Sequence, residues 1–474
     1  MKLVKNYLYN AFYQLFSLLV PLVTIPYVSR VLGAKGIGIN AFTNSNVQYF
    51  VLAGSLGIAL YGNRQIAYYR DNREKTSQAF WEIFFIRAIT ISIALVAFFV
   101  FLNFTTQYRI AYLMQGLLIV AAAFDVSWLF MGVENFKVTV VRNVIVRLVT
   151  LIAIFLFVKT ANDLNLYIAL LSLSQLLGNL TLFPYLRHYI DKPRWHSLNL
   201  WQHLRPSLVL FVPQIATQVY LVLNKTMLGS FVSVEAAGFY DNSDKIIKMV
   251  LAIVTATGTV MLPRVANTFA KGNYEQVRKY LYTSFDFVSV LAIPMMFGVA
   301  AVAHGFAVLF FGSEFAPVGP LMMLESIVIV LIAWSNVLGV QYLLPTGHNR
   351  AYTWSVVLGA LVNVVLNVPL ILRLGADGAM IATILSELAV TGFQLYATRK
   401  ELEFRQLFEG QWKYWLAGLA MFAVVFGLTR VLRGGYLSLI IEVIAGVVVY
   451  ATIVVLFRPK LINTIREWRA NGSK

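Results

Sequence analysis

The chain has 474 residues, of which 59% are hydrophobic and 12% are charged. Soluble domains carry about 25% charged and about 45–50% apolar residues, so this composition excludes an ordinary soluble domain and is typical of a protein that crosses a membrane many times. The chain has no cysteine, which excludes disulfides and thiolate metal or redox sites. Its net charge of +17 raises the question of an acidic partner.

Apolar runs that end at charged residues, glycine or proline predict fourteen membrane spans. They lie near residues 8–29, 41–61, 80–102, 109–131, 140–158, 164–186, 206–230, 239–262, 284–303, 318–344, 352–372, 378–398, 412–431 and 436–457. The first run resembles a signal peptide, but it is longer than a signal peptide allows and no small-residue cleavage site follows it, so we expect a span. The tenth run is long enough to be tilted or broken.

The basic residues are distributed unevenly between the two sides of these spans. With a cytoplasmic N-terminus, the cytoplasmic segments carry 26 of the 38 Lys and Arg residues, the outer segments carry seven, and five fall within spans. Because basic residues accumulate on the cytoplasmic side of membrane proteins, this distribution predicts that both termini are cytoplasmic. Most of the positive charge is therefore a topology signal, and we expect no nucleic-acid partner.

Two segments, residues 29–45 and 224–243, repeat one pattern after an apolar run. Arg30 precedes Lys225 by 195 residues, and the glycine and asparagine residues that follow have similar spacing. Spans 1–6 and 7–12 also have the same order. This predicts an all-α polytopic membrane protein with two parallel six-helix repeats around a central cavity and an appended helix pair. The expected domains are an N-lobe (1–190), a cytoplasmic inter-lobe linker (191–205), a C-lobe (206–400), and spans 13 and 14 with a cytoplasmic tail (401–474).

Four segments resemble those of polysaccharide repeat-unit flippases of the Wzx type. They read PLVTIPYVSRVLGAKGIG, YGNRQIAYYRDN, LNKTMLG and AGFYDNSDKIIKMV. These flippases share a superfamily with the MATE drug exporters and the lipid II flippases. The resemblance implies that the protein moves oligosaccharides linked to undecaprenyl diphosphate from the cytoplasmic to the outer leaflet of a bacterial cell membrane by alternating access. Family members usually have an acidic residue before the lysine of span 7, where this chain has Asn224.

The resemblance also implies the partners of the protein. They are the lipid-linked oligosaccharide, membrane lipids, H⁺ or Na⁺ as a coupling ion, and a polysaccharide polymerase and glycosyltransferases. The motifs do not distinguish capsule, exopolysaccharide, O-antigen and teichoic acid as the final polymer.

Several basic residues fall within or at the ends of predicted spans, where a charge costs about 2.5–3.5 kcal/mol on insertion scales. A pyrophosphate that crosses the membrane would need such cations, because Arg binds phosphate oxygens in pairs and Lys acts as a point charge. The candidates are Arg30, Lys225, Arg87, Arg147, Arg64, Lys245 and Lys248. The alternative for those near span ends is that the side chain reaches the membrane surface. For Arg64 the alternative is that its charge only helps to fix the orientation of the spans.

Carboxylates in spans are the usual carriers of proton or sodium coupling, because burial raises the pKa of a carboxyl group towards the physiological range. The candidates are Asp125, Asp241, Asp244, Glu325 and Glu387, together with Asp286. Asp125 is the first choice because a long apolar run precedes it, and a hydrogen bond to a neighbouring helix is its alternative role. Asp241, Lys245 and Lys248 share one helical face, where they form either an intrahelical ion pair or a polar stripe in the cavity.

No catalytic residue, metal site or cofactor site is expected. The sequence lacks a GxxxxGK[ST] phosphate loop, and His188, His196 and His203 have spacings that match no metal-ligand pattern. One alternative is a MATE-like exporter of small molecules, although a cavity for cationic drugs should be acidic. The other is a membrane polysaccharide polymerase or ligase, although the longest predicted outer loop, residues 304–317, offers only His304 and Glu314 for acid–base chemistry.

Overall fold

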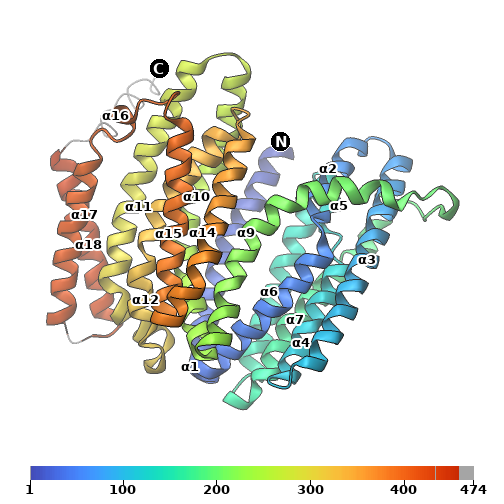
Figure 1. Cartoon of the computed structure of the whole chain (residues 1–474), viewed down its shortest axis with the longest axis horizontal. Helices are drawn as coiled ribbons and strands as arrows, with labels where there is room; N and C mark the ends of the chain where they lie inside the picture. Colours follow the sequence, from blue (N-terminus) through green and yellow to red (C-terminus); the bar gives the residue numbers. More distant parts are fainter. Residues whose placement is uncertain (1, 433, 458–474) are drawn as a thin grey trace. The chain divides into compact units, whose positions relative to one another are not determined.

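The computed structural model describes residues 2–432 and 434–457, and within these ranges every regular element is a helix (Figure 1). Twelve helical segments of this part are long enough and apolar enough to cross a membrane. The first of them, Phe16–Tyr69, covers predicted span 2 and predicted span 1 from residue 16 onward, and a separate helix, Leu204–Phe231, coincides with span 7. Each predicted span therefore consists mainly of helix, which confirms the all-α polytopic fold.

The chain divides into two compact units, Met1–Gly238 and Phe239–Lys474. The helices of the first are α1 (Lys2–Ser55), α2 (Ile58–Tyr69), α3 (Arg73–Phe104), α4 (Arg109–Ala123), α5 (Ser127–Gly132), α6 (Phe136–Phe157), α7 (Leu164–Leu180), α8 (Phe183–Leu186) and α9 (Leu204–Phe231). Helix α10 (Val234–Ala270) begins in this unit and continues into the second. The division into lobes at residues 190 and 206, which follows the sequence repeat, stays a prediction.

The second unit contains the remaining helices. They are α11 (Tyr274–Phe311), α12 (Val318–Glu325), α13 (Ile327–Ser335), a π-helical segment η5 (Asn336–Leu343), α14 (Asn349–Leu374), α15 (Ala376–Thr398), α16 (Phe404–Leu407), α17 (Gln411–Val431) and α18 (Tyr436–Phe457). The tenth predicted span corresponds to α12, α13 and η5 in succession, so the expectation of a tilted or broken span is confirmed as a broken one.

The two units contain matching contacts that support the repeat. Phe80 stacks on Trp128 with ring centroids 5.2 Å apart, and Phe285 stacks on Trp334 at 5.3 Å. The two phenylalanines are 205 residues apart and the two tryptophans 206. Each pair joins the third helix of its repeat to the fourth. Three of the four rings are buried and Trp334 is partly buried, so both repeats have the same aromatic contact.

Proline residues inside the spans leave backbone carbonyl groups without their helical N–H donor. Side chains of other helices donate hydrogen bonds to these carbonyl groups instead. A proline has no N–H to donate to the carbonyl four residues before it. Pro21 in α1 thus frees the carbonyl of Ser17, which accepts a hydrogen bond from Arg147 Nη1 at 3.2 Å. Pro294 in α11 similarly frees the carbonyl of Val290, which accepts from Tyr450 Oη at 3.0 Å. These bonds matter because water cannot replace them in the membrane.

Two glycines allow a bend in α1 and a close backbone contact with another segment. Gly33 has φ 69° and ψ 176°, so it bends α1 between the predicted spans 1 and 2 in a conformation that favours glycine. Gly38 lies against the backbone of Val234, and a Cβ atom at Gly38 would be 2.1 Å from the Val234 carbonyl oxygen. Backbone atoms of the two segments therefore touch at this point.

Gly38→Ala is expected to lower the free energy of unfolding by about 1–3 kcal/mol, because the added methyl group can fit only if one backbone segment moves. The measurement is thermal unfolding of the purified protein in detergent. Gly392→Ala is the matched control, since a Cβ there meets nothing within 4 Å. Equal unfolding midpoints for the two variants would contradict the close contact.

The predicted inter-lobe linker is held to the first unit by a buried carboxylate. Glu82 of α3 accepts hydrogen bonds from Asn199 N at 2.8 Å, Gln202 Nε2 at 2.8 Å and His203 Nε2 at 2.6 Å. The other ring nitrogen of His203 lies 2.7 Å from Tyr61 Oη. A ring protonated on Nε2 donates to Glu82 and accepts from Tyr61, so His203 has a structural role here.

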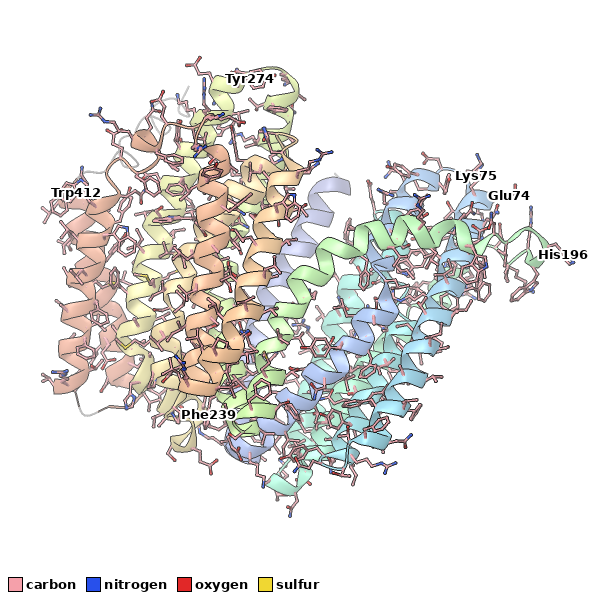
Figure 2. The ribbon with its side chains drawn as sticks, in the orientation of Figure 1. Glu74, Lys75, His196, Phe239, Tyr274 and Trp412 are labelled. Atoms are coloured by element: carbon pink, nitrogen blue, oxygen red, sulfur yellow. The ribbon has the colours of Figure 1, made fainter. Side chains whose placement is uncertain are left out.

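Glu82→Ala is expected to release the segment 191–205, because three donors on this segment lose their buried acceptor at a cost of about 1–3 kcal/mol each. Limited proteolysis of the purified protein should then cut within this segment at least about tenfold faster. Glu74→Ala is the control, since Glu74 pairs with Arg194 of the same segment but both side chains are more than 60% exposed. Figure 2 shows Glu74 at the start of α3 and His196 in the linker. Similar cleavage of both variants would contradict the assigned role of Glu82.

Candidate functional site

A charged pair lies inside the first unit, where the third and fourth spans meet. Arg87 of α3 is only 3% exposed, and its Nη2 lies 3.4 Å from Oδ2 of Asp125. The sequence analysis proposed Arg87 as a cavity cation and Asp125 as a coupling carboxylate, and the structure brings the two together. They form an ion pair in which the arginine is the buried member and the aspartate side chain is 26% exposed.

Asp125 occupies the break between α4 and α5. Its Oδ1 accepts a hydrogen bond from Ser127 N at 3.1 Å, and its backbone carbonyl accepts one from Trp128 Nε1 at 3.1 Å. An aspartate that accepts a bond from the first turn of a helix stabilises the start of that helix. The carboxylate of Asp125 therefore interacts with two groups. It accepts a hydrogen bond at the start of α5, and it pairs with the guanidinium of Arg87.

Two further polar residues extend the pair across α6 and α7. Arg142 of α6 is close enough to Asp125 for an electrostatic interaction, and its Nη1 donates to Asn179 Oδ1 at 3.1 Å. Asn179 Nδ2 donates to the carbonyl of Ala121, just before the break, at 2.7 Å. We call these four residues, Arg87, Asp125, Arg142 and Asn179, the α4–α5 break cluster.

The break cluster holds two guanidinium groups and one carboxylate, so its formal net charge is +1. Arg87 Nε and Nη1 are buried and have no hydrogen-bond partner among the residues that the structure describes. Buried donors without partners cost free energy. The contact of Arg87 with Asp125 thus leaves two nitrogen atoms of the guanidinium without a hydrogen-bond acceptor.

The second unit contains another charged cluster, at the start of α10. Asp241 pairs with Lys245 at 2.5 Å and Asp244 pairs with Lys248 at 2.6 Å, both along the helix. This agrees with the intrahelical alternative, except that Lys248 pairs with Asp244 and not with Asp241. Glu325, at the end of α12, accepts a hydrogen bond from Ser243 Oγ at 2.5 Å and is 2% exposed. Three candidate carboxylates thus lie on α10 and the adjoining end of α12.

The repeated cations both lie in the first unit. Arg30 is exposed on α1, whereas Lys225 is half-buried on α9. Lys225 interacts electrostatically with Tyr49 in the second half of α1. The next residue, Thr226, donates a hydrogen bond to Asn46 Oδ1 at 3.0 Å, so α9 packs against this half of α1.

The other candidates have separate surroundings. Arg64 is exposed and lies over the ring of Tyr61 at 5.8 Å, and Arg147 bonds to the backbone of α1. Glu387 is buried on α15, one turn after Thr383, which contacts Tyr240. Asp286 accepts a hydrogen bond from Gln411 of the appended helix α17 at 3.3 Å.

Sequence reasoning missed three polar residues. Arg142 was counted as a cytoplasmic topology charge, although it lies two turns inside α6. Asn179 gave no separate signal. Glu442 is the single charged residue of α18, and an isolated acid in such an apolar run was a signal that could have found it.

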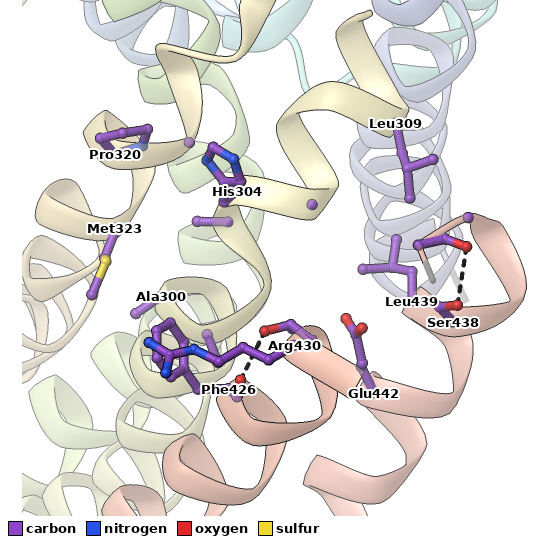
Figure 3. Close-up of a pocket in the computed structure, with 17 residues that line it drawn as sticks. Ala300, His304, Leu309, Pro320, Met323, Phe426, Arg430, Ser438, Leu439 and Glu442 are labelled. Carbon is purple, nitrogen blue, oxygen red and sulfur yellow. Dashed lines mark hydrogen bonds between the residues drawn. The ribbon is translucent and has the colours of Figure 1, made fainter. Parts of the chain in front are cut away.

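A cavity of about 460 Å³ lies in the second unit between α11, α12, α17 and α18. His304, Arg430 and Glu442 are the charged or ionisable residues that line it, and the close-up in Figure 3 shows all three. In the part of the chain that the structure describes, no group of three or more His, Asp or Glu side chains is arranged to hold a metal ion.

Comparison with known sequences identifies relatives. The sequence model of the polysaccharide biosynthesis protein family matches residues 3–269. A protein of Escherichia coli K12, provisionally assigned as an O-antigen transporter, is 23% identical over 84% of this chain and 97% of its own length. A protein of Haloferax volcanii, provisionally assigned as a low-salt glycan biosynthesis flippase, is 25% identical over 52% of each chain.

Comparison with solved structures identifies the fold. The inward closed conformation of the lipid II flippase MurJ has a TM-score of 0.79 and 13% identity and covers 97% of this chain and 100% of its own. An inward-facing multidrug resistance MATE family transporter has a TM-score of 0.61 and 13% identity, with coverage of 81% and 94%. The sequence relatives are named as a transporter and a flippase, in agreement with the expectation of a transporter and not an enzyme.

Proposed function

The chain belongs to the polysaccharide biosynthesis protein family, and from this premise we propose that it flips oligosaccharides linked to undecaprenyl diphosphate from the cytoplasmic to the outer leaflet by alternating access. The family match over residues 3–269 is the observation that carries the proposal. The proposed location is the bacterial cytoplasmic membrane with both termini in the cytoplasm, because most basic residues lie on that side of the spans.

The diphosphate of the substrate is the part that needs compensating charge. It carries about two negative charges, which are costly to move through hydrocarbon without cations. Arg30 and Lys225 are the proposed phosphate-binding residues, since they recur at matching positions of the repeat. Arg147 and Arg64 are weaker candidates, because one bonds to the backbone of α1 and the other lies over Tyr61.

The proposed site of coupling to H⁺ or Na⁺ is the break cluster. Asp125 makes one long contact with Arg87, at 3.4 Å, and its side chain is partly exposed. Binding of a cation or proton to Asp125 would cancel its attraction for Arg87 and free the buried guanidinium to take another partner. Because Asp125 also stabilises the start of α5, this change would act directly on the shape of the fourth span. Asp241, Asp244 and Glu325 form a second proposed site in the other unit.

A reconstituted transport assay tests the function. The purified protein is placed in liposomes with a fluorescent lipid-linked oligosaccharide, and a membrane-impermeant glycosidase reports how much substrate reaches the outer leaflet. We expect protein-dependent movement, and none in protein-free liposomes. Transport of a cationic dye without movement of the lipid-linked sugar would favour a MATE-like exporter instead.

Coupling is tested in the same liposomes by collapse of the proton and sodium gradients one at a time. Loss of transport with one gradient identifies the coupling ion. Unchanged transport after both treatments would contradict the proposed coupling role of the two carboxylate sites. It would not contradict the proposed flippase function.

A further inference from the structure

The cavity shown in Figure 3 lies at one end of the appended helices. It is lined by the end of α11, the start of α12, the end of α17 and the start of α18. Most of its walls are apolar, with Leu309, Pro320, Met323 and Leu439 among them. The predicted topology puts this end of the four helices at the outer side of the membrane.

Glu442 is the unusual residue of this cavity. It lies in the second turn of α18, is 6% exposed and belongs to the cavity wall. In the ranges 2–432 and 434–457, no hydrogen bond or ion pair of its carboxylate is found. A carboxylate in a membrane span without a partner is costly, so a ligand is the natural partner to consider.

Arg430 supplies the opposite charge in the same space. It lies in the last turn of α17, and its guanidinium lies over the ring of Phe426 at 4.7 Å. Arg430 and Glu442 line one cavity but do not form an ion pair with each other. His304 of α11 adds a second nitrogen group to the lining. The cavity therefore presents a cation and an anion that do not pair with each other.

We propose that this cavity binds the headgroup of a phospholipid that carries both a phosphate and a primary ammonium group, of the phosphatidylethanolamine type. Arg430, with His304, binds the phosphate, and Glu442 accepts hydrogen bonds from the ammonium. The apolar walls take the glycerol and the first acyl carbons.

The charges distinguish this ligand from simpler ones. An anionic headgroup would satisfy Arg430 but leave Glu442 without a counter-charge, and a simple cation would do the reverse. A cavity of about 460 Å³ is also far larger than a proton or sodium ion needs. The headgroup of phosphatidylcholine has both charges, but its methylated nitrogen has no N–H to donate to Glu442.

Native mass spectrometry of the full-length protein in detergent tests the proposal with four ligands: phosphatidylethanolamine, phosphatidylglycerol, phosphatidylcholine and free phosphoethanolamine. We expect phosphatidylethanolamine to bind about tenfold more tightly than phosphatidylcholine, as for the loss of a charge-assisted hydrogen bond. Equal affinity of these two lipids would overturn the proposal. Binding of free phosphoethanolamine as tight as that of the lipid would assign the site to a soluble ligand and overturn the lipid assignment.

Two variants assign the effect to the cavity. The unaltered protein should also bind phosphatidylethanolamine more tightly than phosphatidylglycerol, which has no ammonium group. Glu442→Gln should abolish this preference, and Arg430→Gln should weaken the binding of both lipids. Arg373→Gln, at an exposed outer helix end that does not line the cavity, should change neither. A preference that persists in Glu442→Gln would overturn the role of Glu442.

A lipid series makes the test independent of any variant. Phosphatidylethanolamine with one, two and three N-methyl groups loses its N–H donors stepwise. The affinity of the unaltered protein should fall along this series, and a flat series would overturn the proposal.

Discussion

Replacing Asp125 with leucine is expected to lower the free energy of unfolding by about 3–5 kcal/mol, because it leaves the guanidinium of Arg87 buried without its counter-charge. Arg87 is 3% exposed, so water cannot replace the lost partner unless the helices separate. The double variant Arg87→Met/Asp125→Leu should recover most of this loss, since two apolar side chains of similar size can fill the space. The measurement is thermal unfolding in detergent for both single variants and the double variant.

The double variant also separates stability from transport. If the break cluster couples transport to an ion gradient, the double variant folds but no longer responds to that gradient in liposomes. The conservative change Asp125→Glu keeps the charge and should retain part of the response. Full gradient-driven transport by the double variant would show that the pair is only structural, and an undisturbed Asp125→Leu variant would show that the ion pair contributes nothing to stability.

The spans could be predicted well because the signal for a membrane helix is long and local. The expected range 109–131 agrees with α4 and α5 together, which extend from Arg109 to Gly132. The break inside this span was not predicted, because no glycine or proline marks residues 124–126. It depends on hydrogen bonds of Asp125 and Trp128, which form only in the folded chain.

The site shows the same division between local and distant contacts. The Asp241–Lys245 pair could be predicted because its members are four residues apart on one helix. Arg87 and Asp125 are 38 residues apart and belong to different helices, so sequence reasoning assigned them to two unrelated roles. Only the packing of α3 against the α4–α5 break makes them one group.

One residue of the site, Arg142, was missed because the positive-inside rule assigned it to the membrane surface. The positive-inside rule assigns a cation near the start of a span to the cytoplasmic surface. Arg142 satisfies that description, yet Arg142 bonds to Asn179 of α7 and interacts with Asp125. The rule describes the distribution of charge over whole segments and does not determine where one side chain points.

Lys225→Ala and Arg30→Ala are each expected to reduce the initial rate of lipid-linked oligosaccharide transport by about ten- to a hundredfold, because a charge-assisted contact to phosphate is worth about 1.5–3 kcal/mol. Lys225→Arg should retain more activity than Lys225→Ala, since it keeps the charge. The control is Lys35→Ala, which removes another exposed cation of α1 that has no counterpart in the repeat. All variants must first show unfolding midpoints close to that of the unaltered protein.

The alternative for both residues is that they reach the membrane surface and only fix the topology. A surface cation contributes to insertion and not to transport, so its removal would lower the yield of inserted protein without changing the rate per molecule. Unchanged transport in both alanine variants would therefore exclude the phosphate role. If the two cations bind one diphosphate, the fold-loss of transport rate in the double variant should be smaller than the product of the two single fold-losses. The reason is that the first substitution already weakens the contact of the remaining cation with the phosphate. Independent losses would assign the two cations to separate steps of transport.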